Sequence, residues 1–217
     1  MSQAHEVDAR SSRAERRKQQ TRAALIEAAQ TIFAERGMAD ASVRQVTDAA
    51  DVGFGSFYNH FTSKAELFDV AVTEVFEAIA QHLDRLLADE DDPAVVFTTS
   101  MRLIGRLMNT QPRMARVMMH SLGTLLTSPK GFAPHAMRDI EAAAAAGRFK
   151  IDDPQVALAC AAGGLVAIMQ LAVNDPDVSI ADLTDAMVLN VLLMFRVDEE
   201  EARRLTSLPL PHDDLTS

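Results

Sequence analysis

Residues 42–61 read SVRQVTDAADVGFGSFYNHF, and this stretch decides the fold. Ser42 followed by Gln45 is the pattern of a capping box, in which two side chains satisfy backbone groups at the start of a helix. Residues 51–53 interrupt the helical pattern, and a second short helix is expected over 54–60. A helix of about eight residues, a tight turn and a second helix is the spacing of a DNA-binding helix-turn-helix. An ordinary corner between two helices has the same spacing, so both interpretations stay open.

The second helix of this stretch is expected to present its side chains to the major groove of DNA. Serine can bond to several bases, asparagine can make two hydrogen bonds to adenine, and phenylalanine can cover a thymine methyl group. The residues expected to face the bases are Phe54, Ser56 and Asn59. The residues expected to bind phosphates around them are Arg44, Tyr58, His60 and Lys64.

Charge is distributed unevenly along the chain. The formal net charge is −10, yet residues 1–68 are neutral overall and residues 69–217 hold the whole acidic excess. Residues 10–22 alone carry a net charge of +5. A basic arm on a neutral head, with an acidic body behind it, would orient the molecule on a polyanion. A solvated tail that makes no specific contact is the alternative, and charge alone does not separate the two.

Composition and periodicity predict an all-α protein. Ala, Leu and Met are abundant, whereas Gly and Pro number only 9 and 8. We expect an N-terminal three-helix head with the helix-turn-helix, joined by a long helix to an α-helical body. Capping boxes are expected at Ser12 with Glu15, which opens the first helix, and at Ser63 with Glu66, which opens the long one. Gly37 is expected to end the first helix as a left-handed cap. The expected regions are a flexible arm over 1–12, the helix-turn-helix domain over 13–66, the body over 67–205 and a flexible tail over 206–217.

Methionines are concentrated in the body, and methionine suits an apolar pocket that accepts flexible ligands. A methionine that only fills a gap in the core is the alternative at each position. The expected pocket residues are Phe97, Met101, Ile104, Met108, Met118, Met119 and His120, with Asn109 as a further polar contact. This lining suits an uncharged, lipophilic small molecule. Arg102 and Arg106 can instead serve an acidic ligand, although charges at that spacing are usually a solvated face.

Two long helices, expected at about 154–173 and 180–195, are apolar on more than one side. Such helices are buried both by their own core and by a partner. The stretch 156–173 has no charge over 18 residues, near the length of a membrane span, but eight of them are Ala or Gly, which favours a buried helix. One face consists of the small residues Val156, Cys160, Gly163, Gly164 and Ala167, and a larger face consists of Val188, Leu192 and Phe195.

Motifs of enzymes and metal sites are not found in the sequence. No pair of the six His has the four-residue spacing of a metal site, and neither a Gly-rich phosphate loop nor a nucleophile elbow occurs. We therefore expect no catalytic residues, no metal and no cofactor, although residues distant in sequence can still meet in space. The single cysteine excludes an intrachain disulfide and fits a reducing cytoplasm. Residues 1–20 lack the apolar core of a signal peptide.

Residues 53–64, GFGSFYNHFTSK, resemble the TetR (tetracycline-repressor-like) family of bacterial transcriptional regulators, as does FAERG at 33–37. The resemblance covers roughly residues 15–68. It implies that Ser42 caps its helix and touches the DNA backbone, and that the DNA face is lined by Ser56, Tyr58, His60 and Lys64. Two positions depart from the family pattern. Asp51 stands where Gly is common, but Asp tolerates left-handed geometry, and Gly53 replaces a frequent Ser but is an acceptable cap.

The resemblance also implies what the body does. Residues past about 68 would bind a ligand and dimerise, with the subunit interface on the last two long helices. We expect a homodimer that binds a palindromic operator in double-stranded DNA, acts as a repressor, and is released when a small lipophilic molecule tilts the long helix over 64–88. Recognition helices would then be spaced about 34–36 Å apart. The alternative is a helical ligand-binding or scaffolding dimer without operator-specific DNA binding.

Overall fold

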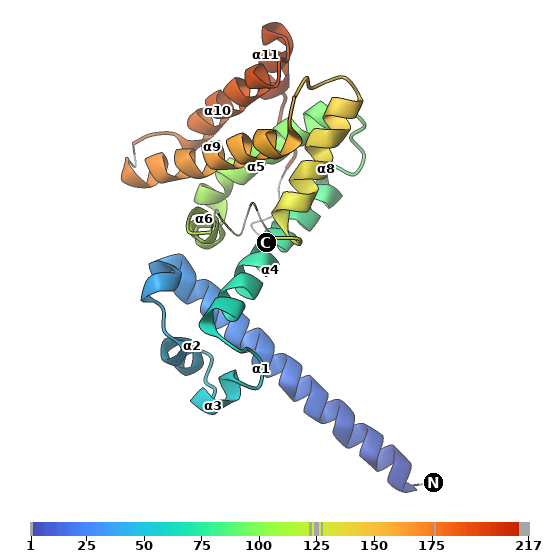
Figure 1. The fold of residues 1–217 in the computed structure, drawn as a ribbon, viewed down its shortest axis with the longest axis vertical. Helices are drawn as coiled ribbons and strands as arrows, with labels where there is room; N and C mark the ends of the chain where they lie inside the picture. The colour runs from blue at the N-terminus through green and yellow to red at the C-terminus, as the bar shows by residue number, and fades with distance from the viewer. Residues whose placement is uncertain (1, 122, 124–125, 127, 176, 213–217) are drawn as a thin grey trace. The chain divides into compact units, whose positions relative to one another are not determined.

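The computed structural model describes residues 2–121, 123, 126, 128–175 and 177–212, and their side chains except those of 2–13 and 108. All regular elements within these residues are helices (Figure 1). The expectation of an all-α protein is therefore confirmed. The chain divides into two units, Met1–Ala71, called here the head unit, and Val72–Ser217, called the body unit.

The head unit contains α1 (Ser2–Asp40), α2 (Val43–Ala49), α3 (Phe54–Phe57) and the beginning of α4 (Lys64–Leu86). The expectation that the first helix opens at Ser12 is wrong, because α1 is already helical from Ser2. Gly37 has a φ of 71° and interrupts the helical backbone within α1, so the expected end of the regular helix is confirmed. Glycine adopts this positive φ without the steric penalty that a side chain would add.

The helix-turn-helix forms because aromatic residues anchor its second half in the core of the head unit. Phe57 and Phe61 are almost completely buried, with ring centroids 5.8 Å apart. Asp51 has a φ of 53°, as expected of the tight turn. α3 is shorter than expected, because the NH groups of Asn59 and His60 bond to carbonyls three residues back and tighten the chain into a turn.

The body unit continues with α5 (Pro93–Thr110), α6 (Pro112–Met119), α8 (Phe132–Ala145), α9 (Pro154–Asn174), α10 (Ile180–Met194) and α11 (Glu199–Ser207). α5 lies at the centre and contacts α6, α8, α9, α10 and α11. Three side chains cap helices of the body unit: Asp92 before Pro93, Asp153 before Pro154, and Ser179 at the start of α10. These caps satisfy backbone NH groups that have no partner inside the helix.

α9 has the length and apolar composition of a membrane span, a property that core helices of soluble proteins share. It packs against α5, α6, α8 and α10. One side is buried in the body unit through Ala157, Ala161, Leu165 and Met169. These contacts favour the expected packed helix.

Candidate nucleic-acid interface and ligand cavity

Two aromatic side chains of the helix-turn-helix are exposed on the head unit. Phe54 is 52% exposed and Tyr58 57% exposed. Their rings meet edge to face at 5.8 Å, and Tyr58 also contacts the buried Phe57 at 5.1 Å. The buried ring therefore holds Tyr58 in place at the surface. Exposed, rigidly held aromatic rings are suited to contact a partner.

Polar residues lie before and after this aromatic pair in the sequence, at the start of α2 and in the turn after α3. The Ser42 hydroxyl accepts a bond from the Gln45 NH at 3.2 Å, and Gln45 Oε1 accepts one from the Ser42 NH at 2.9 Å. The expected capping box is thus confirmed, and it fixes the start of α2. Arg44 and Asn59 are exposed, whereas Ser56 is half-buried. Contact of these residues with DNA stays a prediction.

Lys64 makes hydrogen bonds within the head unit, and its expected phosphate contact stays a prediction. Its ammonium group donates to the carbonyls of Met38 at 2.8 Å and Ala41 at 2.9 Å, with Ala39 at 3.5 Å. The side chain is half-buried. These bonds satisfy carbonyls at the end of α1, so Lys64 fastens α1 to the beginning of α4. The sequence motif did not reveal this because the partners are more than 20 residues away.

His60 lies beside a group of positive charges from α1. Its Nδ1 is buried and has no hydrogen-bond partner among the described residues. Burial, followed by the charges of Lys18 and Arg22, lowers the pKa of His60. Arg22 also lies over the Phe61 ring, 5.2 Å from its centroid. The imidazole is therefore neutral near pH 7, and α1 contributes positive charge next to the turn that follows α3.

A narrow cavity in the body unit lies between α4, α5 and α8. Its volume is about 20 Å³, room for about one water molecule, so it would have to widen to hold a ligand. The apolar lining consists of Ala80, Leu83, Phe97, Met101, Phe132 and Ala136, and the polar lining of Asp84, Ser100, His135 and Asp139. Once widened, apolar walls with a few polar groups suit a small molecule that also forms hydrogen bonds.

The polar lining belongs to a charged network between α4 and α8. Asp84 accepts bonds from His135 Nδ1 at 2.9 Å and Arg138 Nη2 at 2.7 Å. Arg138 also donates to Asp139 at 2.7 Å, and His135 Nε2 lies 3.8 Å from Glu77. Burial raises the pKa of Asp139, with Arg138 opposing the shift. Burial opposes ionisation of Asp84 too, but bonds from Arg138 and His135 lower its pKa.

The expected ligand residues are only partly brought together. Phe97 and Met101 line the cavity. Ile104 and Met118 are buried but do not line it, Met119 is half-buried, and His120 and Asn109 are exposed. The side chain of Met108 lies outside the described residues. Sequence reasoning missed Asp84, His135 and Asp139, because charged residues on an amphipathic helix look the same whether they face water or a cavity.

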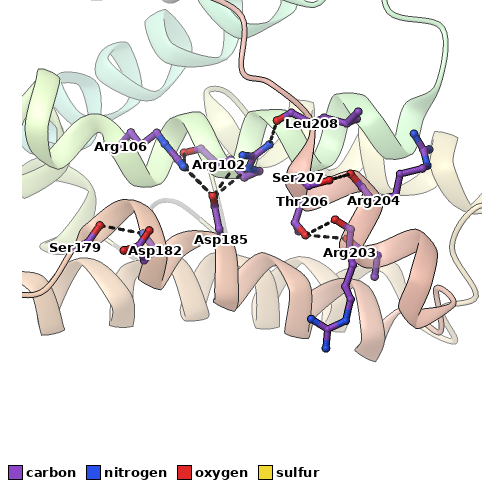
Figure 2. A network of polar contacts seen from close by, with 11 residues as sticks. Arg102, Arg106, Ser179, Asp182, Asp185, Arg203, Arg204, Thr206, Ser207 and Leu208 are labelled. Carbon is purple, nitrogen blue, oxygen red and sulfur yellow. Dashed lines mark hydrogen bonds and ion pairs between the residues drawn. The ribbon is translucent and has the colours of Figure 1, made fainter.

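Arg102 and Arg106 form neither a solvated face nor a site for an acidic ligand. Figure 2 shows both guanidinium groups directed at Asp185 of α10, with donor distances of 3.0 Å from Arg102 Nε and 2.9 Å from Arg106 Nη2. Arg102 is buried and also donates to the carbonyl of Leu208 at 2.7 Å. The protein supplies its own carboxylate, Asp185, which ties α5 to α10, while the bond from Arg102 to Leu208 ties α5 to the chain after α11.

The exposed apolar residues of α9 and α10 differ in part from those expected. Val156, Cys160 and Ala167 are exposed, and Gly163 and Gly164 are half-buried. The prediction that the larger apolar face forms the subunit interface is wrong. The core of the body unit buries Val188, Leu192 and Phe195, which are at most 1% exposed. Phe195 instead packs with Phe97 and Phe149. The exposed large apolar side chains here are Val156, Leu171, Val173, Leu193 and Met194.

Comparison with known families identifies both parts of the chain. Residues 25–71 match the model of "Bacterial regulatory proteins, tetR family". Residues 92–207 match the "Tetracyclin repressor-like, C-terminal domain", which covers more than half of the chain. Within the described residues, no group of three or more His, Cys, Asp or Glu is arranged to hold a metal ion.

Two named relatives match over about a third of the chain. The repressor DhaR of a Mycobacterium species is 37% identical over 71 residues, which is 33% of this chain and 36% of DhaR. The regulator TtgR of Pseudomonas putida is 38% identical over 74 residues, or 34% of this chain and 35% of TtgR. The matched part therefore spans about a third of the length of these relatives.

One similar solved structure covers almost the whole chain. RolR in complex with resorcinol is 31% identical, with a TM-score of 0.67, and the match covers 92% of this chain and 99% of that one. RolR without ligand matches with 32% identity, a TM-score of 0.69, and coverage of 88% and 98%. From these matches and the helix-turn-helix geometry, we conclude that the chain belongs to the TetR family of bacterial transcriptional regulators.

Proposed function

We propose that this protein is a ligand-responsive transcriptional repressor that binds a palindromic DNA operator as a homodimer in the cytoplasm. The observation that carries the proposal is the exposed pair Phe54 and Tyr58 on a helix-turn-helix that matches the TetR head. A monomeric protein gains nothing in stability from holding two large aromatic rings in water. Contact with the major groove gives these rings a partner.

The DNA face divides into base-reading and positioning residues. Phe54, Ser56 and Asn59 read base edges, since they lie on α3 or in the turn that follows it. Tyr58 joins them at the groove. Ser42, Arg44 and His60 position the head on the phosphates. Lys64 is left out because its ammonium group already donates to carbonyls of the protein.

The dimer forms through the exposed apolar side of α9 and α10. Its residues are Val156, Cys160, Ala167, Leu171, Val173, Leu193 and Met194, and Gly163 allows close approach of a second copy, whereas Gly164 faces Met187 of its own subunit. The partner that covers this side is a second copy of the chain. In a two-fold dimer the same surface of each subunit meets its counterpart, so one apolar side per subunit is enough. Two-fold symmetry of the protein in turn requires a palindromic operator.

The effector is a small aromatic compound with hydroxyl groups. It binds in the cavity between α4, α5 and α8, which widens from about 20 Å³ to admit it. Phe97, Met101 and Phe132 contact the ring, while Asp84 and Asp139 accept hydrogen bonds from its hydroxyls. Two observations support this chemistry: the carboxylates in an otherwise apolar lining, and the likeness to RolR, whose structure contains resorcinol. This hydroxylated effector replaces the purely lipophilic one that was expected from the methionines.

Release follows from competition for Asp84. This carboxylate of α4 is bound by His135 and Arg138 of α8. A hydroxyl group that binds Asp84 weakens these bonds and shifts α4, which is one continuous helix from Lys64 in the head to Leu86. The effector must bind the shifted state more tightly, because equal affinity for both states shifts nothing.

The first experiment is a selection of genomic DNA fragments with the purified protein, followed by sequencing. We expect one palindrome to be enriched, and resorcinol, used as the probe, to release it. Failure to enrich any DNA at low salt would contradict the repressor and favour a ligand-binding or scaffolding dimer. Enrichment that saturating resorcinol leaves unchanged would contradict the hydroxylated-aromatic effector alone.

A further inference from the structure

The N-terminal part of α1 precedes the region that matches the TetR head model. α1 begins at Ser2, whereas the match to the TetR head begins at residue 25. Figure 1 shows α1 continuing well past α2 and α3 toward the N-terminus. This extension is the N-terminal part of the first helix of the head, ahead of the region that matches the head model.

The matched head is acidic, which is unfavourable for a DNA-binding module. Residues 25–71 contain three basic side chains and seven acidic ones. One of the basic side chains, Lys64, donates to backbone carbonyls and is half-buried. Binding to DNA derives much of its free energy from the neutralisation of phosphates by Lys and Arg. The matched head supplies little of this charge.

The extension of α1 supplies the missing charge. Residues 10–22 carry a net +5. Among the described side chains, those of Arg16, Arg17 and Lys18 are all exposed. A rigid helix holds these cations at fixed positions, which reduces the conformational entropy lost when they bind.

This basic segment is continuous with the proposed DNA face. Arg22 lies over the Phe61 ring, 5.2 Å from its centroid, and Lys18 and Arg22 act electrostatically on His60. Hydrogen bonds from Thr62, and to a smaller extent the positive charge of Arg22, lower the pKa of Glu66. Its carboxylate accepts bonds from the NH and hydroxyl of Thr62, both at 2.6 Å. Positive charge thus extends from the turn after α3 along α1.

We propose that Arg16, Arg17 and Lys18 on the extension of α1 form a second DNA-binding surface, which binds backbone phosphates beside the operator half-site. The proposal rests on the proposed operator binding and adds a contact outside the helix-turn-helix. Because α1 continues past α2 and α3, the contacted phosphates flank the base pairs that α3 reads. Such contacts add affinity without adding sequence preference.

The test compares the salt dependence of operator binding between variants. The variant Arg16→Gln/Arg17→Gln/Lys18→Gln removes three charges per subunit, and glutamine keeps the helix propensity high. The matched control Arg85→Gln/Arg116→Gln/Lys130→Gln removes three exposed charges from the body unit. The probe is the palindrome recovered by genomic selection, with flanks of arbitrary sequence about one helical turn, or roughly 10 base pairs, long.

We expect the α1 variant to reduce the slope of log affinity against log salt by about 5 if all six cations of the dimer bind phosphates. Its affinity should decrease at least roughly tenfold at low salt, while its preference for the palindrome over a scrambled duplex stays unchanged. The control should keep the wild-type slope. The charge-retaining variant Arg16→Lys/Arg17→Lys should keep most of it.

Two results would overturn the proposal. One is a wild-type slope in the α1 variant, and the other is an equal loss of slope in the control. In both cases the wild-type protein still binds the palindrome, so the proposed function stands. If the wild-type protein bound no DNA at low salt, the operator function would fail first and the α1 surface with it.

Discussion

The head and body units place their functional side chains in opposite ways. In the head unit the aromatic pair Phe54 and Tyr58 stands in water on a short helix. In the body unit Asp84 and Asp139 line a narrow cavity between helices. A surface for DNA must expose its binding groups, whereas a site for a small molecule must remove the ligand from water. Substitution of an exposed binding group in the head should therefore affect binding and leave stability unchanged, whereas substitution of a side chain that packing has paired should change stability.

The largest effect is expected from Asp185→Ala in the body unit. It leaves two arginines, one of them buried, without their carboxylate partner, which typically costs about 3–5 kcal/mol. The control Asp152→Ala breaks the exposed pair with Arg196 and should cost about 0–1 kcal/mol. Chemical unfolding measures both values. Equal losses in the two variants would show that the buried network does not stabilise the body.

Tyr58→Ala should weaken operator binding strongly while the dimer stays folded. Loss of one good base contact costs about 1–3 kcal/mol, and the dimer loses two. Because Tyr58 is 57% exposed, its removal leaves the core of the head unit in place. Fluorescence anisotropy with the selected palindrome measures the affinity, and thermal unfolding gives the control. Unchanged affinity would remove Tyr58 from the DNA face.

Asp84→Asn should reduce the response to resorcinol about tenfold to hundredfold, because hydrogen bonds to charged groups contribute roughly 1.5–3 kcal/mol. The isosteric amide fills the same space at the cavity. Asp89→Asn, in the exposed loop after α4, is the matched control. The resorcinol concentration that releases half of the bound operator is the quantity to compare. A normal response in Asp84→Asn would place the effector elsewhere.

Lys64→Met tests whether this residue belongs to the DNA face or to the framework of the head. Loss of its bonds to the carbonyls of Met38 and Ala41 should destabilise the head by about 1–2 kcal/mol. The salt slope of operator binding should stay at the wild-type value. If the slope instead decreased by about one unit per subunit, Lys64 would be a phosphate contact after all.

The smallest effect concerns pH. Burial, with Lys18 and Arg22, lowers the pKa of His60 from its ordinary value of 6.5. Below pH 6.5 the unfolded chain therefore binds more protons at this site than the folded head does. The free energy of unfolding of the head is therefore highest above pH 6.5 and decreases as the pH falls from 6.5 through the pKa of His60 in the folded state. Thermal unfolding between about pH 5 and 7.5 should show this decrease, and His60→Gln should flatten it.

Local patterns predicted the start and stop signals of the helices. Ser42 with Gln45 forms the expected capping box, and Asp51 adopts the expected left-handed turn. Each of these features depends on hydrogen bonds or dihedral angles within about four residues. The same is true of the motif over 53–64, which allowed the head to be recognised. The start of α1 was missed, because the pattern of a cap at Ser12 does not force a helix to begin there.

Long-range packing decided the rest. His135 meets Asp84 across 51 positions of sequence, and Lys64 meets Met38 across 26. The rotation of α10 buries Val188, Leu192 and Phe195 in its own subunit. The sequence by itself determined the helical class of the fold, because helices and their caps depend on short-range bonds. It also identified the family, through the motif over 53–64. Only the tertiary structure decided which charges line a cavity, fasten a helix or remain in water, because the free energy of a charge depends on the neighbours that packing provides.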